Sequence, residues 1–253
     1  MTTTTIPTNK AVLSSLLRAD FTTQWRNRKS VILILLIPVI ILIAWQGLVN
    51  KLGGAFVLAN CIAIGLNAIG LMGYSNAIAR DRDKGIFQRL RVAPLTAWSI
   101  MASRLAVQLA MILLVTTSVF VAGYYVDHIT LSPAGYAVGF AMAFVGGAVY
   151  LGLGQAIVGL IKNAETVNAV TRLVYFVFIM VGMLAELGAF NGLGDKVVNA
   201  VKWSPYGTVK HILSAGMQPA TWNQHSSMAL LVTIGYALVF SALGIKWFKW
   251  SSK

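Results

Sequence analysis

The charged side chains of this sequence gather in one short segment, and their types limit the chemistry available there. Seven charged residues, five basic and two acidic, lie between Arg80 and Arg91 in the string RDRDKGIFQRLR. The full 253 residues contain only 20 Lys or Arg and 7 Asp or Glu. Such groups form ion pairs and charge-assisted hydrogen bonds. The segment offers no convincing nucleophile–base pair, so we expect it to bind rather than to catalyse.

The order of residues within this segment predicts a short helix with an apolar face. The five residues before Gly85 are of mixed sign and are expected to be solvated, and Gly85 permits a break in the backbone. Ile86, Phe87 and Leu90 then share one helical face. Pro94 ends this helix because it disfavours helical backbone at the preceding residue. A basic stop-transfer loop would not explain the apolar residues, so we expect this face to lie on the membrane or in a partner's groove.

No other stretch offers a catalytic, phosphate-binding or metal-binding pattern. The sequence contains no G-x-x-x-x-G-K-[ST], H-E-x-x-H or C-x-x-C string. Cys61 is the single cysteine and cannot form an intramolecular disulfide. We therefore expect no catalytic residue, no metal site and no cofactor site in this chain.

The composition places the elements around the charged segment in a bilayer. Hydrophobic residues make up 57% and charged residues 11% of the chain, whereas soluble domains have about 45–50% and about 25%. A helix that crosses the bilayer needs about 20 mostly apolar residues. Six stretches meet this requirement, and we expect spans at 31–49, 55–79, 97–125, 133–161, 166–187 and 227–247.

The distribution of basic residues predicts the orientation of these spans. With the N-terminus inside, sixteen Lys and Arg residues lie on the cytoplasmic side and four lie outside: Lys51, Lys196, Lys202 and Lys210. The positive-inside bias therefore places both termini and the 80–96 connection in the cytoplasm. The net charge of +13 then reflects topology, so we expect no nucleic-acid partner. Arg104 and Arg172, inside the third and fifth spans, are expected to snorkel toward this interface.

The segment before the first span predicts an amphipathic helix at the membrane interface over 10–29. Leu17, Phe21 and Trp25 approximate one helical face, and Arg26 supplies charge near the interface. A basic juxtamembrane anchor and a surface for a partner are equally compatible with this pattern.

Small residues and a proline predict features of the remaining helices. Gly147 in one stripe of the fourth span, and Gly152, Ala156 and Gly159 in a second, allow close helix packing within the bundle. A dimer seam or a substrate path would use the same stripes. In the outer segment 188–226, two apolar faces separated by Pro205 predict two re-entrant half-helices; an outer loop lying flat on the membrane remains the other interpretation.

The charged segment resembles the signature loop of ABC type-2 exporter permeases. The matching residues are Asp81, Arg82, Lys84, Gly85, Leu90, Val92, Pro94 and Leu95. Ile86, Gln88 and Ala93 depart from the pattern, since the family more often has Thr, Glu, and Thr or Ser at these positions. LSAGMQ, residues 213–218, is only superficially similar to the ABC signature LSGGQ, because no phosphate-binding loop precedes it.

The resemblance extends over the whole chain and implies a fold and a partner. The implied fold is all-α, a single transmembrane domain over 1–253 with six spans, similar to type V ABC exporters. An ABC ATP-binding subunit, which holds ATP and Mg, would dock on the 80–96 coupling loop. The residues that the resemblance assigns to ATPase coupling are Asp81, Arg82, Lys84, Gly85, Ile86, Phe87, Leu90, Arg91 and Pro94.

The resemblance also implies a biological setting. Two permease copies would pair in a bacterial or archaeal plasma (inner) membrane and export an amphipathic or hydrophobic drug, antibiotic, lipid or peptide. A polysaccharide-type ABC permease has the same architecture. An ATP-independent carrier or channel and a non-transporting assembly factor are the rival classes. No chain of buried acids crosses the expected spans, which disfavours ion-coupled transport.

Overall fold

The computed structural model describes residues 9–92, 97–186, 188–190, 192 and 194–248, and its regular elements are helices. The side chains of 9–12, 29–30, 90–92 and 97–98 lie outside this description. The elements are α1 Asn9–Arg26, α2 Arg28–Ala44, α3 Gln46–Leu52, α4 Gly54–Asn67, the π-helical segment η1 Ala68–Tyr74, α5 Ser75–Asp83, α6 Ile86–Val92, α7 Ala97–Asp127, α8 Pro133–Leu160, α9 Ala164–Glu186, α10 Asp195–Lys202, α11 Pro205–Met217, the 3-10 turn η3 Pro219–Thr221 and α12 Gln224–Trp247.

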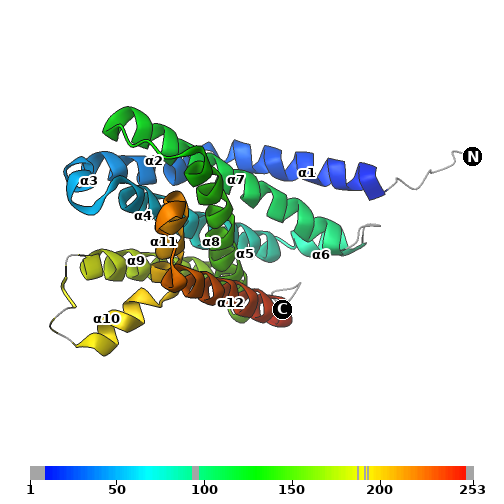
Figure 1. Ribbon diagram of the computed structural model, residues 1–253. Coiled ribbons are helices and arrows are strands. Elements are labelled where there is room, and N and C mark those ends of the chain that lie inside the picture. The colour runs from blue at the N-terminus through cyan, green and yellow to red at the C-terminus, as the bar shows by residue number, and fades with distance from the viewer. Residues whose placement is uncertain (1–8, 93–96, 187, 191, 193, 249–253) are drawn as a thin grey trace, which may run out of the picture.

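The chain passes back and forth between two ends of a helix bundle. α3 and α10 lie at the left of Figure 1, whereas α6 and the end of α12 lie at the right. We use the name α6 end for the side of the bundle where α5 terminates and α7 begins. The opposite side is the α3 end. Five described helices are long and apolar enough to cross a membrane: Gly54–Asp83, Ser99–Asp127, Pro133–Leu160, Ala164–Glu186 and Gln224–Trp247.

The first expected span, 31–49, differs from the structure. α2 ends at Ala44, because the chain turns at Trp45 before α3 begins. Its 17 residues extend only about 26 Å, which is less than the roughly 30 Å hydrocarbon core. A sixth span arises when the bent pair Leu13–Arg26 and Val31–Ala44 is counted as one.

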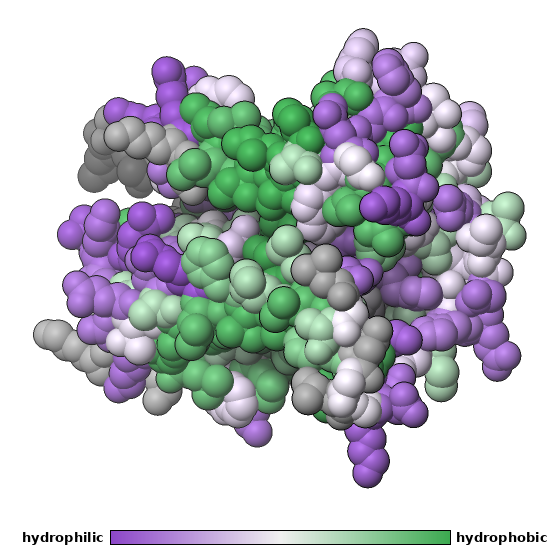
Figure 2. All heavy atoms as spheres, turned by 90° about the vertical axis from the view of Figure 1, so that its left-hand side faces the viewer, coloured by the Kyte–Doolittle hydropathy of each residue, from purple (hydrophilic) through white to green (hydrophobic). Residues whose placement is uncertain are grey.

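The second span is the central helix of the bundle. Gly54–Asp83 is 89% buried over its most apolar window, whereas Gln224–Trp247 is only 17% buried. The peripheral helices turn leucines such as Leu231 and Leu238 outward, with exposed fractions of 69% and 66%. Figure 2 shows a hydrophobic area between two groups of hydrophilic side chains on one face of the molecule. Apolar side chains both inside and outside are typical of a bundle whose solvent is lipid.

A π-helical segment interrupts this central helix, which the sequence analysis did not predict. Over Ala68–Tyr74 the backbone widens, and the Ser75 hydroxyl donates to the carbonyl of Gly70 at 2.7 Å. A side chain at Gly70 would collide with the backbone of Tyr150 on α8. Single-turn π segments inside α-helices are frequent at functional sites.

The small-residue stripes of α8 pack inside this chain. Gly147 lies against Ile112 of α7, Gly152 lies against Ser241 of α12, and Gly159 lies against Trp247. Ala156 is 5% exposed, and its amide nitrogen lies 3.0 Å from where a Cβ on Gly244 would be. These small residues bring α8 close to both α7 and α12.

Gly154 provides a test of this packing with a matched control. A Cβ at Gly154 would meet the Ser75 hydroxyl and lie 2.6 Å from the Gly70 carbonyl oxygen, whereas a Cβ at Gly235 on α12 would meet nothing within 4 Å. We expect Gly154→Ala to lower the free energy of unfolding by about 1–3 kcal/mol through overpacking. Gly235→Ala should leave it unchanged or raise it by up to about 1 kcal/mol.

Cys61 supplies the measurement for these two variants. It is the only cysteine and is buried, so a thiol-reactive dye reports thermal unfolding of the purified protein in detergent. Equal unfolding midpoints for Gly154→Ala and Gly235→Ala would show that the α8–η1 contact is looser than the structure indicates.

The segment 188–226 contains two helices separated where Pro205 was expected to break the chain. The Ser204 hydroxyl caps α11 by accepting from the amide of Gly207 at 3.1 Å, and Pro205 is the first helical residue. α11 buries Tyr206, Val209 and Leu213, whereas none of the described residues of α10 is fully buried. α11 is therefore part of the bundle and α10 lies at its surface.

Candidate functional site

The charged segment lies at the α6 end of the bundle and continues the central helix. α5 runs to Asp83, four residues beyond the expected end of the second span. Gly85 then turns the chain with a φ of 68°, in the region that favours glycine. α6 follows from Ile86. The predicted break at Gly85 and short helix after it are present.

Arg82 is buried rather than solvated, which corrects the sequence-based expectation. Its side chain is 1% exposed and points at the end of α8. Nη1 donates to the carbonyl of Val158 at 2.7 Å, and Nη2 donates to those of Ile161 and Lys162 at 2.6 Å each. The last carbonyls of a helix lack partners within the helix. The guanidinium supplies these partners and places a positive charge at the negative end of the α8 dipole.

Asp83 binds the beginning of the next helix in the same turn. Its carboxylate accepts from the amide of Ala164, the first residue of α9, at 3.2 Å. The Asn163 side chain caps the same helix by accepting from the amides of Glu165 and Thr166 at 2.8 and 3.0 Å. Arg82 and Asp83 thus hold both sides of the α8–α9 turn.

Asp81 connects the end of the central helix to two further helices through Arg104. Arg104 Nη1 lies 2.5 Å from the Asp81 carboxylate, and its Nε lies 3.9 Å from that of Asp20 on α1. The Ser103 hydroxyl also donates to Asp20. Arg104 reaches toward the α6 end, as expected, but there it is paired with carboxylates, and its side chain is only 14% exposed. Arg172 is exposed and donates to the Asn168 side chain at 3.1 Å.

Together these residues form what we call the charged clasp, Asp81, Arg82, Asp83 and Arg104. It joins the end of α5 to α7, to the α8–α9 turn and, through Asp20, to α1. Sequence reasoning selected Asp81 and Arg82, but it expected Asp83 only to be solvated, treated Arg104 separately and did not select Asp20. The signal that could have connected Arg104 to this group is its short distance in sequence from the charged segment.

Phe87 is inside the chain, which corrects its expected position on an exposed face. The ring is 0% exposed. The Arg104 guanidinium carbon lies 5.3 Å from its centroid, and the Phe248 ring packs edge-on at 5.8 Å. The ring has enough apolar cover within its own chain because the end of α12 returns to it. Ile86 is half-buried, while Gln88 and Arg89 are exposed.

Other predicted residues of this region differ in their surroundings. Lys84 is exposed at the turn. The side chains of Leu90 and Arg91, and all of Pro94, lie outside the described residues. On α1, Leu17 is half-buried, while Phe21, Trp25 and Arg26 are exposed.

A second group of polar side chains lies at the α3 end. Lys210 of α11 is ion-paired with Glu186 of α9, and its ammonium lies 5.0 Å from the centre of the Phe56 ring. His211 and His225 have ring centroids 4.9 Å apart. These residues line a cavity of about 370 Å³. The ion pair ties α11 to the end of α9.

The helical fold agrees with a comparison to protein families. The model of ABC-2 type transporters matches residues 11–187, which is more than half of the chain and includes all four clasp residues. The chain belongs to the ABC-2 type transporter family. A search of curated proteins finds no significant match.

Family membership establishes the general class of this ABC-2 permease. It is a multi-pass membrane component of an ABC transporter, and ABC-2 membrane subunits lack an ATPase site of their own. Membership implies an ABC ATP-binding subunit as partner and the lipid bilayer as surroundings.

Proposed function

We propose that this permease is the membrane subunit of an ATP-driven exporter of amphipathic or hydrophobic molecules. A separate ATP-binding subunit supplies ATP, Mg and hydrolysis, and two permease copies pair around the translocation path. Family membership supports the ABC partner. The predominantly apolar bundle, whose charges gather at its ends, supports an apolar or amphipathic substrate over a polysaccharide.

The α6 end faces the cytoplasm in this proposal. Sixteen of the twenty Lys and Arg residues belong to this side of the predicted topology, and the positive-inside bias favours that orientation. α10 and α11 then lie on the outer side. There α11, packed into the bundle and tied to α9 by Lys210 and Glu186, caps the pathway as a re-entrant helix.

The charged clasp is the observation that carries the proposed mechanism. The ATP-binding subunit docks on the exposed surface of α6, which includes Gln88 and Arg89. A displacement of α6 moves the end of α5, and the clasp passes this displacement to α1, α7, α8 and α9 together. The buried Arg82 and the largely buried Arg104 resist separation from their partners because each charge would be left without one. The helices therefore move as a unit between inward-facing and outward-facing states.

Co-purification tests this function with a charge reversal on α6. We expect the native permease to bring down an ATP-binding subunit with vanadate-sensitive ATP hydrolysis. Arg89→Glu should lower the recovered subunit by about tenfold, equivalent to a binding loss of about 1.4 kcal/mol. Lys51→Glu makes the same charge change on exposed α3 at the opposite end and should have no effect.

Transport measurements separate the proposal from an ion-coupled carrier. Export should persist when ion gradients are collapsed and ATP remains. Export that requires an ion gradient and continues without any nucleotide hydrolase would contradict the proposal.

A further inference from the structure

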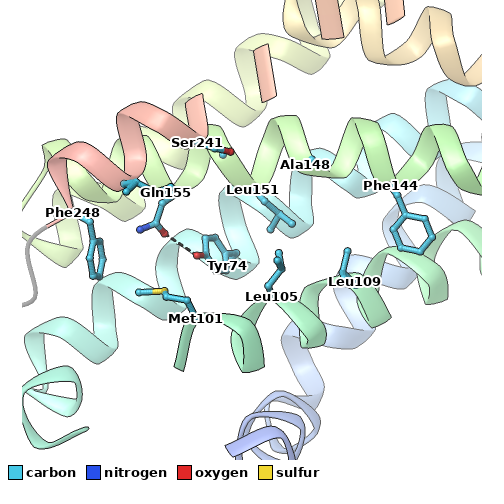
Figure 3. Close-up of a pocket in the computed structure, with 12 residues that line it drawn as sticks. Tyr74, Met101, Leu105, Leu109, Phe144, Ala148, Leu151, Gln155, Ser241 and Phe248 are labelled. Atoms are coloured by element: carbon cyan, nitrogen blue, oxygen red, sulfur yellow. Dashed lines mark hydrogen bonds between the residues drawn. The ribbon is translucent and has the colours of Figure 1, made fainter. Parts of the chain in front are cut away.

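A cavity of about 510 Å³ lies between α7, α8 and α12 in the half of the bundle nearest the α6 end. Its size falls within the range of about 300–1,000 Å³ that is usual for small-molecule sites. Figure 3 shows Met101, Leu105 and Leu109 along one wall, with Phe144 and Phe248 at opposite ends. The cavity is thus elongated along the helices.

Diverging helices create this space. In the outer half of the bundle, a Cβ at Gly139 would lie 3.0 Å from Phe120 of α7, and Gly147 similarly lies against Ile112. Toward the α6 end, Leu105 of α7 and Ala148 of α8 line the cavity. α12 stays close to α8 through Gly152 and Gly159, so the opening lies between α7 and the pair α8–α12.

The opening is on an exposed apolar surface of the bundle. Leu105 and Leu109 on one side are 45% and 38% exposed, and Ile245 on the other side is 77% exposed. All three belong to helices that are long and apolar enough to cross a membrane. A molecule dissolved in the bilayer can therefore reach the cavity sideways without passing through water.

The cavity is polar at one end only. The Tyr74 hydroxyl donates to Gln155 Oε1 at 2.8 Å, and both side chains line the cavity in the part nearer Phe248. Tyr74 is the last residue of the π-helical segment. None of the described residues that line the cavity is charged. An apolar site with a few placed polar groups selects the orientation of its ligand.

We propose that this cavity is a lateral entry site for the transported amphiphile, taken from the cytoplasmic leaflet. The alkyl chain lies against Leu105, Leu109 and Phe144, and an uncharged hydrogen-bonding group such as an amide or hydroxyl reaches Tyr74 and Gln155. This orientation matches a molecule already inserted in that leaflet, with its polar group toward the cytoplasm. The inference rests on the proposed function, because it takes the occupant to be the exported substrate.

The cavity is also in contact with the candidate coupling helix. Phe248 closes its end nearest the α6 end and packs against Phe87 of α6, whose ring lies under Arg104. An occupant that displaces Phe248 therefore also displaces Phe87, which joins α6 to Arg104 of the charged clasp. This contact provides a physical route by which substrate stimulates ATP hydrolysis.

The test uses the permease with its ATP-binding subunit in lipid nanodiscs, and dodecanamide that carries a diazirine at mid-chain. We expect light-induced labelling of the α7 and α8 peptides that line the cavity. Ala148→Trp, at an exposed position of the lining, should lower this labelling about tenfold and abolish stimulation of ATP hydrolysis by dodecanamide. Ala141→Trp, exposed on α8 outside the cavity, should change neither.

Two further probes test the polar end and the source of the ligand. Gln155→Leu should lower dodecanamide labelling about fivefold, as expected for the loss of one hydrogen bond, and leave labelling by diazirine-bearing dodecane unchanged. Phosphatidylcholine with the same diazirine should label the cavity weakly and be displaced by dodecanamide.

Several results would overturn this inference. They are equal labelling of Ala148→Trp and Ala141→Trp, loss of both amide and dodecane labelling in a folded Gln155→Leu, and strong phosphatidylcholine labelling that dodecanamide does not displace. Any of these with normal assembly and basal ATP hydrolysis leaves the proposed function intact. If no ATP-binding subunit binds the permease, the proposed function is wrong. Labelling of the permease alone would still show whether the cavity binds dodecanamide.

Discussion

Replacing Arg82 by alanine is expected to lower the free energy of unfolding by about 3 kcal/mol, because charged hydrogen bonds contribute about 1.5–3 kcal/mol each and water refills part of the site. The side chain donates to the carbonyl of Val158 in the last turn of α8 and to those of Ile161 and Lys162 just after it, and it is 1% exposed. Its removal leaves those carbonyls without a charged partner and separates α5 from the α8–α9 turn. Thermal unfolding followed through Cys61, together with ATP-driven export in vesicles, measures both effects.

Arg80→Ala is the matched control, since it removes the same side chain two residues earlier. Arg80 is exposed, and within the part of the chain that the structure describes its side chain donates to the Asn76 carbonyl of its own helix at 3.1 Å, so we expect a change below about 0.5 kcal/mol. Arg82→Lys keeps the charge but loses the planar array of guanidinium donors. Its loss of unfolding free energy should lie between those of Arg82→Ala and Arg80→Ala. If Arg82→Ala unfolded at the same temperature as Arg80→Ala, the clasp would have no structural role.

The sequence located the charged segment but could not identify its binding partners. Periodicity and charge predicted a solvated run followed by a short helix, and the helix and its Gly85 turn are present. The partners of Arg82 lie 76 to 80 residues further along the chain. Nothing in the local pattern states which helix end comes near, so a buried Arg and a solvated Arg have the same sequence signature.

Phe87 illustrates the same limit for an apolar residue. The pattern predicted that its helix face must pack against other apolar groups, and Phe87 is indeed buried. The cover comes from Phe248 and Arg104, which no spacing rule connects to α6. Tyr74 was not selected either, because its partner Gln155 lies 81 residues further along the chain, on α8.

Phe87→Ala is expected to uncouple transport from ATP hydrolysis while the ATP-binding subunit remains bound. The ring is inside the chain and joins α6 to Arg104 and to Phe248, so its removal weakens transmission rather than the docking surface. We expect subunit recovery within about twofold of the unmodified permease and transport per ATP hydrolysed lower by about tenfold, a coupling loss of about 1.4 kcal/mol. Co-purification measures subunit recovery. The ratio of the transport rate to the hydrolysis rate measures coupling.

Two neighbouring variants decide between transmission and docking. Phe87→Leu fills most of the buried volume and guards against unfolding, since Phe→Ala in a core costs about 3–5 kcal/mol; it should retain subunit binding and show partial uncoupling. Gln88→Ala removes an exposed side chain on the same helix and should affect subunit binding without uncoupling. A folded Phe87→Leu permease that loses its ATP-binding subunit would contradict this prediction, because docking itself would then depend on the ring.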